Sequence, residues 1–230
     1  MMTILDLCAF VWFLACWVGY TRFADLRARS QLTLMSAMHG YRMQWMHEML
    51  HREVRIVDTN IVAILARSAT FLASTTIFIL AGLLAVLGTM DKAMEVVGEL
   101  RYAVQSSREM WELKLFALLM VFIYAFFKFT WSMRHFNYLS VLIGAAPDSR
   151  TIPAWGSSFA ERAARVSSNA TNTFNRGLRA YYFGLAFLGW FLHPLLFIVA
   201  TTLVVGVLYR REFMSKMLRV LGDPSDFSHE

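Results

Sequence analysis

The chain has 230 residues, of which 57% are hydrophobic and only 17% are charged. A water-soluble globule of this size has too little interior to hide so much apolar surface, so the composition excludes an ordinary soluble domain. The net charge of +6 would suggest nucleic-acid binding in a soluble protein, but here the arginines lie beside apolar stretches, where membrane topology explains them better. We therefore expect an integral membrane protein without a nucleic-acid partner.

Three apolar stretches are candidate membrane spans, each close to the length of about 20 residues that crosses the hydrocarbon core. The first covers residues 4–20 and includes Asp6. The second covers 68–88 and carries no charge, and the third covers 115–131 and carries only Lys128. All three are expected to be transmembrane helices.

The fourth apolar stretch, residues 180–209, is longer than one crossing requires. His193 and Pro194 lie near its middle, and proline breaks or kinks a helix because it lacks the backbone N–H. We expect either one tilted, kinked span or a re-entrant pair of half-helices. A titratable ring far from both ends of a span needs a partner or a water-filled cavity, which makes His193 a candidate intramembrane site.

The connections between these spans differ in charge. Arginines gather in residues 21–60 and 132–179, whereas the connection 89–114 has more acidic than basic residues. Because basic connections stay in the cytoplasm, we expect a multi-pass protein of the bacterial inner membrane with its N-terminus outside. Four crossings would place the C-terminal tail outside as well, but Arg210 and Arg211 favour the cytoplasm, so the side of the tail stays open.

Residues 24–58 contain no proline and many good helix formers, which predicts a long amphipathic cytoplasmic helix before the second span. Within it, Met43, His47 and His51 recur every four residues and would share one face. Methionine together with histidine suits Cu(I), so this triplet is a candidate copper site. The alternative is adaptable core packing, which is the commoner use of methionine at helical spacing.

These observations predict an all-α integral membrane protein that forms a single domain over residues 1–230. It would consist of about four transmembrane helices and the long amphipathic cytoplasmic helix, and no Ser/Gly/Pro-rich linker divides it. The fingerprints of hydrolases, metalloproteases and nucleotide-binding enzymes are missing from the sequence, so nothing in it supports an enzyme.

Four blocks of sequence together resemble a known family. They are HREVRIVDTN followed by FLASTTIFILAGLLAVLG (51–88), FKFTWSMRHFNYLSVLIGAAP (127–147), NRGLRAYYFGLAFLGWFLHP (175–194) and LYRREF (208–213). The chain resembles a bacterial family of small integral membrane proteins, with plant relatives, that is catalogued as a domain of unknown function. The likeness runs from about Asp25 to Phe213 and implies a membrane fold, but it brings no catalytic or binding residue with it.

Polar residues within these blocks flank the second, third and fourth spans and would lie at one cytoplasmic interface. They are Arg55, Asp58, Asn60, Arg134, His135, Asn137, Asn175, Arg176 and Arg179. We hypothesise that they form a network, which either locks the helix bundle together or recognises an anion such as a lipid headgroup.

Three functions remain open at this point. Small residues repeat along the second span and at the start of the fourth, as close helix packing in lipid requires, and this favours a homo-oligomer with a channel or permeation role. Thr75, Thr76, Thr201 and His193 would line such a path. The first alternative is an accessory or scaffold subunit that binds a partner complex or anionic lipid through its cytoplasmic Arg-rich face. The second is metal or redox handling by the Met/His helix, with copper as the cofactor.

Overall fold

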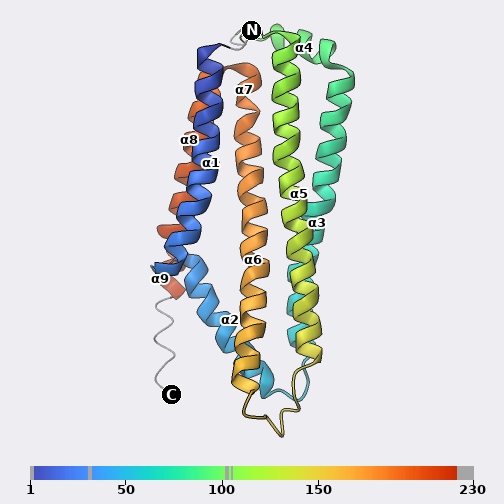
Figure 1. Cartoon of the computed structure of the whole chain (residues 1–230), viewed down its shortest axis with the longest axis vertical. Helices are drawn as coiled ribbons and strands as arrows, with labels where there is room; N and C mark the ends of the chain where they lie inside the picture. Colours follow the sequence, from blue (N-terminus) through green and yellow to red (C-terminus); the bar gives the residue numbers. More distant parts are fainter. Residues whose placement is uncertain (1–2, 31–32, 102–103, 105, 222–230) are drawn as a thin grey trace. The chain divides into compact units, whose positions relative to one another are not determined.

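The computed structural model describes residues 3–30, 33–101, 104 and 106–221, and these residues form helices and turns but no strand. The helices are α1 (Ile4–Ser30), α2 (Leu34–Leu50), α3 (Ile56–Gly88), α4 (Met90–Gly98), α5 (Arg108–Gly144), α6 (Gly156–Phe187), α7 (Gly189–Leu192), α8 (Pro194–Phe213) and α9 (Lys216–Leu221) (Figure 1). The all-α fold is confirmed. Four helical segments within the described ranges are long and apolar enough to cross a membrane, as expected: Ile4–Arg27, Ile56–Gly88, Arg108–Gly144 and Pro194–Leu218.

Helices α3 and α5 extend well past the spans expected from hydropathy. They contain 33 and 37 residues, or about 50 and 55 Å at 1.5 Å per residue, against a hydrocarbon core of about 30 Å. The expected connection 132–179 is mostly helix as well, because α5 continues to Gly144 and α6 begins at Gly156. Only the stretch between them, which contains Pro147 and Pro153, is free of regular helix.

The single helix expected over 24–58 is divided by the structure. The end of α1, all of α2 and the start of α3 share this stretch. Thr33 begins α2 with a capping box, in which its side chain accepts from the backbone N–H of Ser36 and the Ser36 hydroxyl accepts in return. The helix ends at Leu50, and the next helix starts six residues later at Ile56.

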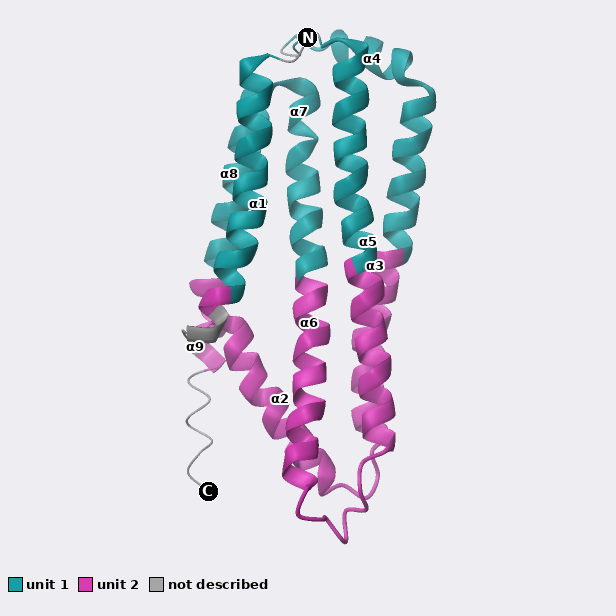
Figure 2. Cartoon of the chain, in the orientation of Figure 1, with its two compact units in different colours: residues 1–25, 74–127, 176–211 teal, residues 26–73, 128–175, 212–230 magenta. Residues whose placement is uncertain are grey.

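The chain divides into two compact units (Figure 2). Unit 1 consists of Met1–Asp25, Ser74–Phe127 and Arg176–Arg211, and unit 2 consists of Leu26–Ala73, Lys128–Asn175 and Glu212–Glu230. Helices α3, α5 and α6 each contribute one stretch to each unit.

In unit 1, the last part of α6 runs antiparallel to α1. Arg179 pairs with Asp25, Phe183 contacts Phe13 and Trp17, and Trp190 stacks on Phe10, so successive partners move toward the start of α1. The interior between these helices is filled by aromatic rings whose centroids lie 5.1–5.9 Å apart. These contacts give unit 1 a packed apolar centre.

The chain reverses direction between α6 and α8, which contradicts the first alternative for 180–209, one kinked span, and agrees with the second in placing a reversal near His193 and Pro194. The rings of Phe187 and Phe197 lie 5.1 Å apart, whereas the same residues would be about 15 Å apart along a continuous helix. Helix α8 then runs parallel to α1, since Phe197 contacts Phe13 and Tyr209 contacts Phe23. His193 therefore lies in a turn at the end of unit 1 and not in the middle of a span.

Unit 2 has a core of methionine, alanine and phenylalanine. Its fully buried residues include Met46 and Met49 of α2, Phe136 of α5 and several alanines of α6. These alanines are Ala160, Ala163, Ala164 and Ala170. Their small side chains on one face let neighbouring helices approach α6 closely.

Candidate functional site

The residues of the expected polar network fall into separate groups. Arg176 and Arg179 bind a carboxylate within unit 1, while Arg55 and Asp58 make their contacts within unit 2. His135 packs against two aromatic rings of its own helix, Asn175 is half-buried, and the other three are exposed: Asn60, Arg134 and Asn137. Arg176 and Arg179 therefore share one partner in unit 1, while Arg55 and Asp58 each have their own partners in unit 2.

Asp25 joins α1 to α6 in unit 1. Arg176 Nη2 lies 2.7 Å from one Asp25 carboxylate oxygen, and Arg179 Nη1 lies 3.1 Å from the other. The Arg179 side chain is only 2% exposed, and its guanidinium carbon lies 5.6 Å from the centre of the Tyr20 ring. The spacing of the two arginines, three residues apart, places them on one helix face and can be read from the sequence. Their acidic partner, Asp25, could not be found from sequence spacing.

A second charged group, which the sequence analysis missed, joins α1, α5 and α7. Lys114 Nζ lies 3.9 Å from Asp6 Oδ1, donates a hydrogen bond of 2.8 Å to the carbonyl oxygen of Trp190, and lies 5.3 Å from the Trp190 ring. The indole N–H of Trp190 donates to the same Asp6 oxygen at 2.8 Å, and Thr3 donates to the other. Both charged side chains are buried, so each needs the other.

Asp6 and Asp25 lie at opposite ends of the part of α1 that belongs to unit 1. Their separation along the helix is about 28 Å, close to the thickness of the hydrocarbon core of about 30 Å. The outward-facing residues of unit 1 between these ends are apolar and highly exposed, for example Val11, Phe78, Phe116, Met120 and Val199. Such a surface is stable in lipid, and the two charged groups lie where the helices would leave it.

In unit 2, Asp58 is fully buried in the first turn of α3. Its carboxylate accepts hydrogen bonds from the indole N–H of Trp45, at 2.7 Å, and from the guanidinium of Arg52. The nearby Arg55 donates to the carbonyl oxygens of Ala146 and Pro147 and to that of Met49 at the end of α2. Arg55 thus connects two turns of unit 2, residues 51–55 between α2 and α3 and residues 145–155 between α5 and α6. It also satisfies carbonyl groups that the end of α2 leaves open.

These two turns enclose a polar pocket of about 400 Å³. Its lining residues are Arg52, Glu53, Arg55, Asp148, Ser149 and Arg150. Three arginines and two acidic residues thus line the space, no apolar residue does, and Arg150 donates to the carboxylate of Asp148. Hydrogen bonds from Arg150, with a further contribution from the positive charge of Arg55, lower the pKa of Asp148 below its usual value. The pocket therefore favours negative charge.

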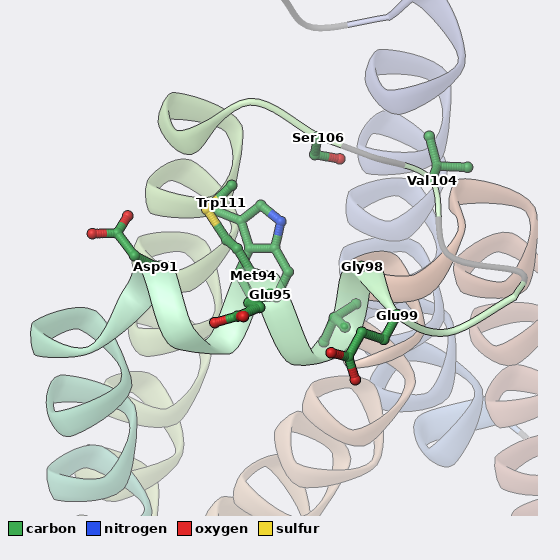
Figure 3. Close-up of a pocket in the computed structure, with 9 residues that line it drawn as sticks. Asp91, Met94, Glu95, Gly98, Glu99, Val104, Ser106 and Trp111 are labelled. Carbon is green, nitrogen blue, oxygen red and sulfur yellow. The ribbon is translucent and has the colours of Figure 1, made fainter.

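Another hollow, of about 410 Å³, lies beside α4 in unit 1 (Figure 3). It is lined by Asp91, Glu95 and Glu99, with the buried Trp111 beneath them, and Asp91 pairs with Arg108 at 2.9 Å. Figure 3 shows the three carboxylates spread along α4 rather than converging on one point. This arrangement does not form a cation site.

The Met/His triplet lies along α2. Met43 packs against the core of unit 2, His47 is half-buried, and the exposed His51 ends the helix, where its backbone N–H donates to the carbonyl oxygen of Glu48. Among the residues that the structure describes, no three His, Cys, Asp or Glu side chains are grouped as metal ligands.

Two of the groups expected to line a permeation path, His193 and Thr76, have local roles in the structure. His193 Nδ1 accepts a hydrogen bond of 3.1 Å from the backbone N–H of Leu195 and so caps the start of α8. The Thr76 hydroxyl bonds to that of Tyr181 at 2.7 Å, and Thr201 is fully buried.

Four helices long and apolar enough to cross a membrane define a multi-pass membrane protein. The chain belongs to the family described as "Protein of unknown function, DUF599", which matches residues 8–217. The resemblance expected from the sequence is therefore confirmed over most of the chain. No curated protein and no solved structure matches it.

Proposed function

We propose that this protein is a membrane-anchored binding module of the bacterial inner membrane, in which unit 2 binds a phosphate-bearing anion in the pocket between its two turns. Unit 1 would hold the chain in the bilayer. The observation that carries the proposal is the state of Asp148, a carboxylate already held by Arg150 and influenced by Arg55. A pocket that stabilises its own carboxylate has the chemistry to receive a stronger anion.

The position of the pocket favours a soluble anion or an anionic group on a partner protein over a lipid headgroup. The uncharged stretch of α3 begins at Ser68. Arg55 comes directly before α3, about 20 Å from Ser68 along the helix axis. A headgroup that stays with its acyl chains in the bilayer would not reach so far. The arginines in residues 21–60 and 132–179 favour a cytoplasmic unit 2 and an outside N-terminus.

A permeation path through unit 1 finds less support. The aromatic rings of Phe13, Phe183, Phe187 and Phe197 fill the centre of this unit, and Thr76 and His193 already have partners. Metal handling finds less support too, because Met43 packs against the core of unit 2.

The proposal is tested by titrating inorganic pyrophosphate into the purified full chain in lipid nanodiscs, with calorimetry as the readout. Asp148 and Arg150 are exposed, so their variants leave the fold intact. Asp148→Asn removes the competing carboxylate and should tighten binding by up to about 5-fold, the value of one exposed ion pair, while Arg150→Gln should weaken it by a similar factor.

Arg165→Gln is the matched control, because it removes an equally exposed arginine of unit 2 whose partner is Glu161, outside the pocket. This variant should bind as the wild type does. Equal affinities in all four proteins, or no binding by the wild type and Asp148→Asn, would contradict an anion site in this pocket.

A further inference from the structure

A second hollow of unit 2 is separate from the pocket between its turns and shares no residue with it. It is a groove of about 490 Å³ between α3 and α6. Its lining residues are Ile64, Arg67, Ser68, Phe71, Leu72 and Phe174. Four of these are apolar and one is a cation, so the groove offers a charge beside a hydrocarbon surface.

The order of these residues along α3 follows the change from polar to apolar sequence. Arg67 is exposed, and it is the last charged residue before the uncharged stretch 68–88. Phe71, one turn further on, is 68% exposed. The cation of the groove therefore lies where α3 would enter the bilayer, and its aromatic wall lies toward the bilayer interior.

We propose that this groove binds one anionic glycerophospholipid, with the lipid phosphate on the Arg67 guanidinium and an acyl chain against Phe71, Leu72 and Phe174. A guanidinium binds phosphate oxygens through two parallel hydrogen bonds, which an apolar neighbour cannot replace. The hydroxyl of Ser68 already donates to the carbonyl oxygen of Ile64, so the arginine supplies the donors. This site does not depend on the function proposed above.

The charges around the groove distinguish the lipid from other occupants. The lining contains no carboxylate that could pair with the ammonium of a zwitterionic headgroup, which favours a lipid with net negative charge. A second copy of the chain is the weaker candidate, because three of the six described acidic residues of unit 2 already pair with arginines of their own chain: Asp58, Asp148 and Glu161. An anionic lipid supplies the missing negative charge and covers the exposed apolar wall at the same time.

The experiment is native mass spectrometry of the full chain after detergent exchange, with phosphatidylglycerol and phosphatidylethanolamine of the same acyl chains added in competition. The wild type should retain phosphatidylglycerol in preference. Arg67→Gln should lower this preference by about 5-fold, the value of one basic residue near an anionic surface. Arg134→Gln removes an exposed arginine of α5 and should retain the wild-type preference.

A second variant tests the apolar half of the site. Phe71→Asn should weaken both lipids by a similar factor, because it removes acyl-chain contact and leaves the headgroup partner in place. Added inorganic phosphate should not displace the lipid. The proposal would be overturned by equal losses of preference in Arg67→Gln and Arg134→Gln, or by displacement of the lipid by free phosphate. It would also be overturned if the wild type were a dimer without retained lipid and Phe71→Asn dissociated that dimer.

Discussion

Replacing Asp6 by Asn should destabilise unit 1 by about 3–5 kcal/mol, because the change leaves Lys114 charged in a site where its side chain is only 1% exposed. The hydrogen bond from Lys114 to the Trp190 carbonyl and its contact with the Trp190 ring remain, but neither supplies a countercharge. Lys114→Met should cost less, since the Asp6 carboxylate keeps hydrogen bonds from Thr3 and Trp190. Replacing both residues, by Leu and Met, removes the two charges together and should restore most of the loss.

Thermal unfolding of the detergent-solubilised chain, followed by tryptophan fluorescence, measures this difference. A loss of 3–5 kcal/mol corresponds to a decrease in Tm of about 6–20 °C for a chain of this length. Glu161→Gln is the control, because its pair with Arg165 is exposed and should change stability by less than about 1 kcal/mol. A double variant as unstable as the sum of the two single variants would refute the coupling between Asp6 and Lys114.

Three further predictions concern single side chains. Burial, followed by two nearby arginines, lowers the pKa of His39 from its usual value of 6.5. The folded state therefore loses stability as the pH falls below about 6.5, and His39→Gln should remove the part of this dependence of Tm on pH that His39 contributes. Gly184→Ala places a Cβ 3.0 Å from the Phe122 ring and should cost about 1–3 kcal/mol, whereas Gly206→Ala meets nothing within 4 Å and should be neutral or stabilising in the same Tm assay. Trp45→Phe removes a hydrogen bond to the buried carboxylate at the start of α3 and should lower the free energy of unfolding by about 1–3 kcal/mol, measured by denaturant titration.

The all-helical membrane fold could be predicted from the sequence because an uncharged stretch as long as 68–88 matches the length of a membrane-spanning helix. The polar half of α6 gives no such signal, since its arginine, serine and asparagine residues resemble those of a loop. The alanines at 160, 163 and 164 follow helical spacing and are the one available sign of a packed helix there. The sequence left open whether the chain bends or reverses at His193 and Pro194, because much of α6, the helix before the reversal, lies within this polar stretch.

The candidate site was harder to predict than the fold. Arg134 lies about 15 Å before the end of α5 at Gly144, whereas the Ala146 carbonyl that accepts from Arg55 lies beyond that end. Residues that follow one apolar stretch in the sequence can therefore be far apart along a long helix. The buried pair of Asp6 and Lys114 joins helices that no local pattern connects. The pocket between the turns of unit 2 depends on Arg150 and Asp148, which lie in a loop without a recognisable motif.

The reversal between α6 and α8 determines how the two ends of the chain can be reached from solution. Among the described residues, five helical segments run between the two ends of unit 1: α1, the unit 1 parts of α3, α5 and α6, and α8. The part of α6 among them is not one of the four apolar spans. If it crosses the bilayer together with them, the number of crossings is odd, and an epitope placed before Ile4 and a second placed after Phe213 would face opposite compartments. In intact spheroplasts, antibodies or added protease should therefore reach only one of the two.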